Sequence, residues 1–131
     1  MSFLSKLHID GEEFNVLEFE FSVEQSVDES NRPCARPKGG VIEMLIESNT
    51  KVDFFEWSKS SSATKDGRIE FYRRDNISSL KKLQFNEAYC IKYTEKFNSI
   101  DNEPLKIFLK ISAKELTMRG TTLTNNWPLK A

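Results

Sequence analysis

Apolar and polar residues alternate with a period of two along most of this chain. Such alternation predicts half-buried strands, each with one apolar and one polar face. The apolar positions are Phe19, Phe21, Val23, Ile69, Phe71, Leu83, Phe85, Tyr89, Ile91, Tyr93, Leu105, Ile107, Leu109 and Ile111. The side chains that we expect to be mostly buried are Phe19, Phe21, Phe71, Phe85, Ile91, Ile107 and Leu109.

Turn signals divide these strands. Asp10-Gly11 is a strong hairpin signal between a first strand near 3–9 and a longer one near 13–24. Lys65-Asp66-Gly67 indicates a turn before the next strand, and Asn102-Glu103-Pro104 ends a further loop. Roughly eight strands follow from this spacing. They predict a mainly β fold, an antiparallel β-barrel or sandwich.

One segment departs from the period of two. Between Thr50 and about Ser60 the apolar residues lie three apart, as with Phe54 and Trp57. Thr50 is a candidate N-cap, with Asp53 at the capping-box position. We expect one short amphipathic α-helix here, packed on the side of the barrel.

The segment from Gln25 to Gly40 has almost no large apolar residues, and its sixteen residues are more than a compact domain usually leaves without structure. It is either a flexible surface loop or an arm that becomes ordered against a partner. Proline lowers the entropy lost on ordering, and arginine offers planar, bidentate pairing. The residues that favour the arm are Arg32, Pro33, Arg36, Pro37 and Lys38.

Candidate chemistry is sparse in these 131 residues. The single histidine, His8, is on the polar side of its strand, where we expect it to be solvated. Cys34 and Cys90 do not form a metal-binding pair, so we expect reduced, partly buried thiols. No nucleophile elbow, phosphate-binding loop or zinc-protease motif is present. We therefore expect no cofactor and no enzymatic activity; an enzyme would need Cys90 as nucleophile with His8 in reach.

Phe71 is followed by Tyr72, Arg73, Arg74 and Asp75, and aromatic residues beside arginines are typical of base-stacking surfaces. However, the formal net charge is -1 and the pI is near 5.9, which argues against binding to nucleic acid or to anionic membranes. We interpret the four polar residues as contacts at a strand end or at a seam between subunits.

The chain has no apolar run near the ~18 residues of a membrane helix, and its start lacks the basic region of a signal peptide. We expect a protein that is made in the cytoplasm and that does not leave by the general secretory route. All 131 residues are expected to form one domain, residues 1–131.

Short runs of residues occur in a characteristic order along the whole chain. They are Met1-Ser2-Phe3-Leu4, Ile9-Asp10-Gly11, the stretch Lys65–Asp75, Ala88-Tyr89-Cys90, Ile111-Ser112-Ala113, Glu115-Leu116 and Asn125-Asn126-Trp127-Pro128. In order and spacing they resemble the Hcp (TssD) tube proteins of type VI secretion systems, in particular the branch found in Bacteroidetes. The loop from 25 to 40 matches more loosely, through Arg32-Pro33 and Gly39-Gly40.

The resemblance implies a structural protein, similar to phage tail-tube subunits, in which a β-barrel carries one helix on its side. Six copies would form a ring, and rings would stack into a hollow tube that carries effector proteins. A contractile sheath would expel this tube, with spike and baseplate proteins as further partners. The interface candidates are Arg32, Pro33, Arg36, Pro37, Lys38, Tyr72, Arg73, Arg74, Asp75 and Trp127. The alternative is a small β-barrel that binds an apolar ligand in its interior.

Overall fold

The computed structural model describes residues 3–48, 54–73, 79–97, 99–100 and 105–125. The elements are β1 (Phe3–Ile9), β2 (Glu12–Phe21), β3 (Val41–Glu47), α1 (Phe54–Lys59), β4 (Lys65–Arg73), β5 (Ser79–Lys96), β6 (Lys106–Met118) and β7 (Thr121–Thr124). This order confirms the prediction of a mainly β chain with one short helix.

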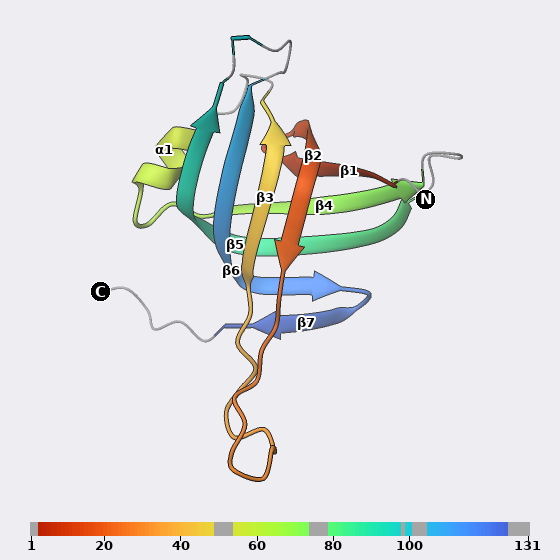
Figure 1. Ribbon diagram of the computed structural model, residues 1–131, viewed down its shortest axis with the longest axis vertical. Helices are drawn as coiled ribbons and strands as arrows, with labels where there is room; N and C mark the ends of the chain where they lie inside the picture. Colours follow the sequence, from red (N-terminus) through yellow and green to blue (C-terminus); the bar gives the residue numbers. More distant parts are fainter. Residues whose placement is uncertain (1–2, 49–53, 74–78, 98, 101–104, 126–131) are drawn as a thin grey trace.

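The strands close into a barrel. Their order in the sheet is β3-β2-β1-β4-β5-β6-β7, every neighbouring pair is antiparallel, and a further pairing of β3 with β6 closes the first six strands into a ring. In Figure 1, β2 and β3 run along the long axis with parts of β5 and β6, whereas β1, β4 and β7 run across it behind them. The predicted antiparallel barrel is thereby confirmed, and β5 and β6 belong to both layers because they bend from one to the other.

The bend in β5 changes which residues face the core. Phe85 is buried, the next buried residue is Ala88, three positions later, and Cys90 follows. Opposite this step, the register of β5 against β4 shifts, and between Cys90 and Lys92 the register of β5 against β6 shifts as well. Each shift moves the alternation by one residue. The expectation that Ile91 is buried is therefore wrong, and its exposed fraction is 53%.

A second correction concerns Lys65-Asp66-Gly67, which lies inside β4 and not in a turn. The register of β4 against β5 shifts between Lys65 and Gly67, so the segment forms an irregularity in the ladder. A Cβ atom on Gly67 would lie 2.6 Å from Cζ of Phe85 and 2.8 Å from the carbonyl oxygen of His8. Gly67 is thus required because the Phe85 ring packs directly against its backbone.

The β1–β2 hairpin has the turn that the sequence predicts. Asp10 and Gly11 both have positive φ angles, 52° and 75°. Two such residues in succession match the right-handed twist of the flanking strands. An ion pair from Lys65 to the Asp10 carboxylate ties the turn to β4.

The barrel interior is filled with apolar side chains. The largest fully buried ones are Phe54, Phe85, Leu7, Ile42, Met44, Ile46, Ile69, Leu83, Leu109 and Ile111. Of the side chains expected in the core, Phe85, Ile107 and Leu109 are confirmed as buried. Phe19, Phe21 and Phe71 are only partly buried; they pack on the core as a group, and the Phe19 and Phe71 ring centroids are 5.3 Å apart.

The two buried residues of helix α1 pack it against β2 and β5. The Phe54 ring lies 5.1 Å from that of Phe14, and Nε1 of Trp57 donates a 3.1 Å hydrogen bond to the carbonyl oxygen of Ala88. The cap expected at Thr50 and Asp53, and the loop end expected at 102–104, lie outside the described residues. Among the described residues, no helix has the length and hydrophobicity needed to cross a membrane.

Candidate functional site

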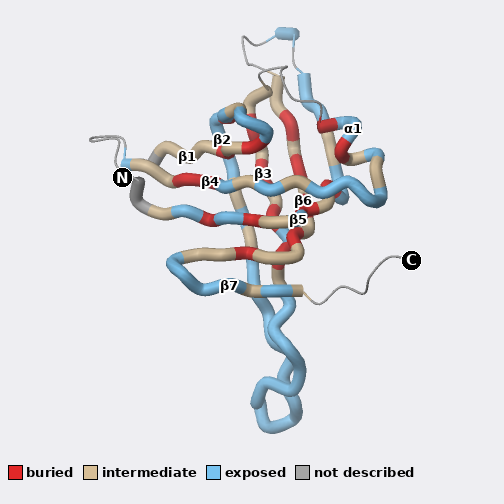
Figure 2. Tube along the Cα trace, turned by 180° about the vertical axis from the view of Figure 1, so that it is seen from behind, coloured by how far each residue is buried: buried red, intermediate tan, exposed pale blue. Residues whose placement is uncertain are grey.

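Residues 22–38, here called the arm, project from the barrel between β2 and β3 (Figures 1 and 2). Every residue of the arm is exposed. Its two limbs are joined by backbone hydrogen bonds, since Glu24 and Lys38 exchange a pair at 2.8 and 2.7 Å and the Cys34 amide donates to Ser26 at 2.9 Å. The segment is therefore a ribbon ordered by its own backbone hydrogen bonds; that it becomes ordered against a partner stays a prediction.

The tip of the arm is shaped by Asp28. One oxygen of its carboxylate accepts hydrogen bonds from the backbone amides of Ser30, at 2.8 Å, and Arg32, at 3.1 Å. The Asp28 amide in turn donates to the carbonyl of Arg32 at 2.9 Å, and Asn31 has a φ of 61°. This local network fixes the turn through hydrogen bonds within the arm itself.

The arm presents half of the predicted interface residues to solvent. These are Arg32, Pro33, Arg36, Pro37 and Lys38. None of the three basic side chains forms an ion pair with another residue that the structure describes. Val27 is 54% exposed, and Cys34 is exposed, so the expectation of a partly buried thiol is wrong for this cysteine. The arm therefore carries apolar and basic groups without partners within the described chain.

Tyr72 belongs to a polar cluster on the outer face of β1, β2 and β4. Its hydroxyl donates a 2.8 Å hydrogen bond to Glu70, to which Nε of Arg68 also donates at 2.6 Å. His8 lies between two carboxylates, with Nδ1 3.5 Å from Glu13 and Nε2 3.9 Å from Glu70. The side chain of His8 is only 13% exposed. It points away from the core as predicted, but it is covered, not solvated.

Each titratable group of the cluster has one predominant protonation state at neutral pH. The hydrogen bond from Arg68, and then that from Tyr72, lowers the pKa of Glu70 below its ordinary value. Burial and the nearby Arg68 charge lower the pKa of His8, while burial and the bond to Glu70 raise that of Tyr72. Glu70 is thus ionised, His8 neutral and Tyr72 protonated, an arrangement that holds three strands together and activates no group for proton transfer.

The remaining candidates fall into two groups. Arg73 is exposed at the end of β4. Arg74, Asp75 and Trp127 lie outside the described residues.

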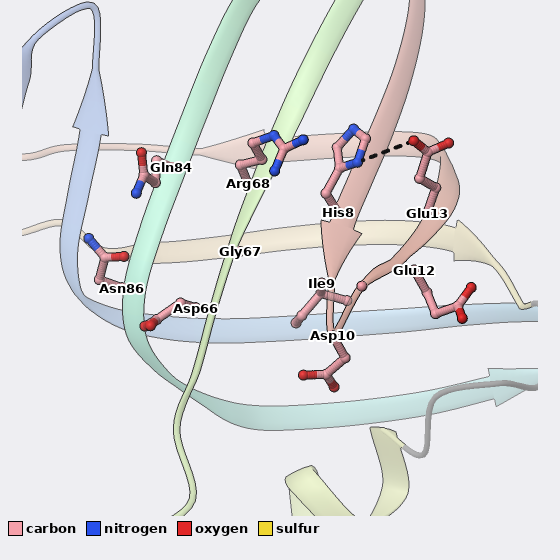
Figure 3. A pocket seen from close by; sticks show the side chains of 11 residues that line it. His8, Ile9, Asp10, Glu12, Glu13, Asp66, Gly67, Arg68, Gln84 and Asn86 are labelled. Carbon is pink, nitrogen blue, oxygen red and sulfur yellow. Dashed lines mark ion pairs between the residues drawn. The ribbon is translucent and has the colours of Figure 1, made fainter.

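A depression of about 500 Å³ borders this cluster, between the β1–β2 turn and the start of β4 (Figure 3). Its rim is rich in carboxylates, but these have partners within the chain. Asp10 pairs with Lys65, Glu13 lies 3.5 Å from Nζ of Lys6, and Asp66 accepts a 2.7 Å hydrogen bond from the Glu87 amide. The acidic side chains therefore tie strands and turns together.

The structure argues against a nucleophilic Cys90. Burial raises the pKa of the Cys90 thiol to about 11, so it is protonated at neutral pH, and it faces the core whereas His8 is on the outer face of the barrel. Among the described residues, no three potential metal ligands lie together. The filled barrel interior also argues against the alternative of a carrier for an apolar ligand.

Two strand edges of the barrel lack a partner among the described residues. β1 pairs only with the first residues of β2, Glu12–Asn15, so that Val16–Phe21 is bonded on one side, to β3. β4 pairs with β5 only as far as Ala88, which leaves 89–96 bonded to β6 alone. The alternation of charges on these strands is visible in the sequence, but the edges could not be found there because they depend on long-range register.

The comparisons with known proteins agree on one family. The family model described as hemolysin coregulated protein Hcp (TssD) matches residues 1–128. No protein with a curated description matches the chain significantly. Among solved structures, Hcp1 from Flavobacterium johnsoniae is 35% identical, with a TM-score of 0.84 over 93% of this chain and 99% of that one.

More distant structures share the fold. Hcp1 from Salmonella typhimurium is 14% identical, with a TM-score of 0.70 over 95% of this chain and 93% of that one. A chain of the PVC sheath-tube complex, an extracellular contractile injection system, is 16% identical, with a TM-score of 0.54 over 89% and 88% of the two chains. The family model over residues 1–128 and the 35% identity to a solved Hcp1 lead to one conclusion: this chain belongs to the Hcp (TssD) family of secretion-system tube proteins.

Proposed function

We propose that this protein is the repeating subunit of the inner tube of a type VI secretion system. Six copies form a closed ring, and rings stack into a hollow conduit in which effector proteins travel. The rings assemble in the cytoplasm inside a sheath, whose contraction expels the tube together with spike proteins; the baseplate organises its base. No signal peptide is needed for this route.

The observation that carries this proposal is the arm. The arm is a ribbon of seventeen exposed residues, and it is ordered by its own backbone hydrogen bonds. Among the described residues, it does not fold back onto the barrel. Ordering an exposed segment costs conformational entropy, and contacts with a partner offset that cost. A neighbouring ring is the partner that stacking provides, and the arm projects well beyond the ends of β2 and β3, the strands that it joins (Figure 1).

The basic limb of the arm supplies contacts suited to reversible stacking. Arg32, Arg36 and Lys38 are free to pair with acidic residues of the next ring. Each exposed ion pair contributes only about 0–1 kcal/mol, so stable stacking rests on the repetition of equivalent arms around the ring. Rings therefore remain separate in dilute solution and join where a growing tube holds them in place.

Native mass spectrometry and negative-stain electron microscopy of the purified protein test the proposal. At tens of micromolar, about the range in which weak assemblies form, closed six-membered rings are expected. A population of monomers only would contradict it.

Charge reversal in the arm separates the stacking role from ring formation. The variant R32E/R36E is expected to form rings but no tubes, and to abolish secretion. K59E/R119E is the matched control, because it changes the net charge equally at two exposed sites outside the arm. Loss of the ring in R32E/R36E, or undiminished secretion, would contradict the assignment of the arm.

A further inference from the structure

The arm joins the barrel through two glycines, Gly39 and Gly40, here called the arm root. Gly39 is half-buried and Gly40 is buried, whereas every residue of the arm itself is exposed. Within the arm, Glu24 and Lys38 form an isolated bridge, which is separate from the ladder of β2 with β3 because that ladder ends at Phe21. The direction in which the arm projects therefore depends on the contacts of its root.

Asn125, directly after β7, connects the arm root to the barrel. Its Nδ2 donates two hydrogen bonds of 2.9 Å, one to the carbonyl oxygen of Gly39 and one to that of Ala113 on β6. The backbone amide of Asn125 donates a 2.7 Å hydrogen bond to the carbonyl oxygen of Lys114, which fixes Asn125 on β6. One side-chain amide thus ties the start of the arm to a core strand.

This arrangement requires an asparagine. A primary amide nitrogen carries two N–H donors, and here both meet carbonyl oxygens. A carboxylate of the same size would place an acceptor against two acceptors, and an apolar side chain would leave both carbonyls without this donor. Asn125 opens the run Asn125-Asn126-Trp127-Pro128, whose other three residues lie outside the described residues.

Gly40 is fitted closely to Asn125. Its φ of 94° is a conformation that glycine adopts readily, and its carbonyl oxygen accepts a 2.7 Å hydrogen bond from the Ala113 amide. A Cβ atom on Gly40 would lie 2.5 Å from Nδ2 of Asn125 and 2.6 Å from the carbonyl oxygen of Ala113. Any side chain at this position would therefore push Asn125 away from the arm root.

Leu123 of β7 packs against the other glycine of the root. Its side chain lies on the core, and a Cβ atom on Gly39 would overlap its Cδ2. Cγ2 of Val23, on the opposite limb of the arm, would lie 3.1 Å from the same Cβ atom. β7 is not one of the six strands that close the barrel, and it lies at the end from which the arm projects (Figures 1 and 2). Its contacts with the root give this extra strand a role.

We infer that Asn125 is the positioning residue of the arm: together with Leu123 it fixes the arm root on the β6–β7 hairpin and sets the direction in which the arm projects. The inference rests on the proposed function, in which the arm meets a neighbouring ring. A limb of about eight extended residues spans roughly 26 Å, so a rotation of about 20° at the root would displace the tip by about 9 Å.

That displacement is larger than the distance over which an ion pair acts. An exposed pair needs its nitrogen and oxygen within about 4 Å of each other. Arg32 and Arg36 therefore meet acidic partners on another ring only when the arm root is held. Fixing the root in advance also reduces the entropy lost when the arm binds.

Cys34 provides a native probe of the arm direction. Its thiol is exposed, whereas Cys90 is buried and has its pKa raised to about 11, so labelling at neutral pH modifies Cys34 alone. Lys59→Cys adds a reference site on α1, at an exposed position. Nitroxide labels on both cysteines give a distance distribution by pulsed electron paramagnetic resonance, with labelled protein diluted into unlabelled protein so that pairs between chains are rare.

The unmodified sequence at position 125 is expected to give one narrow distribution. In Asn125→Asp and in Asn125→Ala the distribution should broaden by about 9 Å, the displacement that a rotation of about 20° produces. Thr124→Ala, at the exposed neighbouring residue, is the matched control and should leave the width unchanged. Circular dichroism confirms that the variants fold. Without labels, both Asn125 variants should form rings but lose stacking by negative-stain microscopy.

The outcomes separate this inference from the proposed function. A broad distribution with Asn125 in place, or an unchanged width in both variants, refutes the role of Asn125, since a purely structural residue would alter stability and not direction. Broadened arms with undiminished stacking refute the claim that stacking needs a fixed arm. If the unmodified protein forms no rings, the proposed function fails, and the width still decides the role of Asn125 because it is measured within one chain.

Discussion

The barrel core and the arm differ in where their contacts are made. The Phe85 side chain is 0% exposed and packs entirely against residues of its own chain, whereas the Val27 side chain on the arm is 54% exposed to solvent. The core is stabilised by burial of apolar area, and the arm is ordered by backbone hydrogen bonds and by the Asp28 turn.

The difference shows what each region is for. Changes in the core should alter the free energy of unfolding, and assembly only through it. Changes in the arm should leave unfolding almost untouched and alter assembly directly. The strand edges at Val16–Phe21 and at 89–96 resemble the arm in this respect, since Leu17 and Ile91 on them are exposed.

The largest effect is expected from Phe85→Ala. Loss of a fully buried ring should reduce the free energy of unfolding by roughly 3–5 kcal/mol, measured by urea denaturation. Phe97→Ala is the matched control, because that ring is 75% exposed and its removal should cost little. Equal stability of the two variants would show that the inward face of β5 is assigned wrongly.

Gly67→Ala should have the next largest effect. The new methyl group would overlap Cζ of Phe85, at 2.6 Å, and the His8 carbonyl, at 2.8 Å. Displacement of the ring and of the β1 backbone should cost about 1–3 kcal/mol, as is typical of overpacking. Thermal unfolding measures it, and an unchanged melting temperature would mean that β4 does not approach Phe85 as described.

Much of the barrel could be predicted from the sequence, because its signals are local. The Asp10-Gly11 turn, the alternation in β6 and the spacing of Phe54 and Trp57 each depend on neighbouring residues. The exposure of Ile91 could not be predicted in this way, since the register shifts in β5 arise where the strand bends between two layers. The bend is a property of the closed barrel.

The site was predictable in part for the same reason. The arm stands out locally by its prolines and basic residues, and the structure exposes them as expected. The polar cluster around Tyr72 needs His8 and Glu70 from different strands, and the ion pair of Lys110 with Glu43 needs β6 beside β3. Such pairs follow only from long-range register. The interface assignment stays a prediction for all ten candidate residues, and Arg74, Asp75 and Trp127 also lie outside the described residues.

A smaller effect is expected from pH, through His8. Because burial lowers the folded-state pKa of His8, the unfolded chain takes up the proton first as the pH falls below about 6.5. The free energy of unfolding should therefore decrease between pH 7.5 and 5.5. The lowered pKa of Glu70 acts in the same direction, but only below its ordinary value of 4.5.

His8→Gln isolates this contribution. Urea denaturation at pH 7.5 and at pH 5.5 should show a smaller decrease for the variant than for the unmodified protein. An identical decrease in the two proteins, or a rise in stability towards pH 5.5, would mean that His8 is not covered in the folded state.

The smallest effect on stability is expected from removing the arm. Replacing residues 25–37 by Asn-Gly joins Glu24 to Lys38, which already exchange two backbone hydrogen bonds, by a two-residue hairpin turn. The free energy of unfolding should change by less than about 1 kcal/mol, since loop length has a weak effect on stability. Rings should form and stacking should be lost. Unfolding of the shortened chain would show that the arm supports the barrel.

Cryo-electron microscopy of the unmodified protein at tens of micromolar, about the range where weak assemblies form, tests the central claim most directly. The proposed function predicts closed rings of six copies, from which the arms project towards the position of the next ring. Isolated barrels alone, or rings in which the arms are buried between neighbours of the same ring, would contradict it.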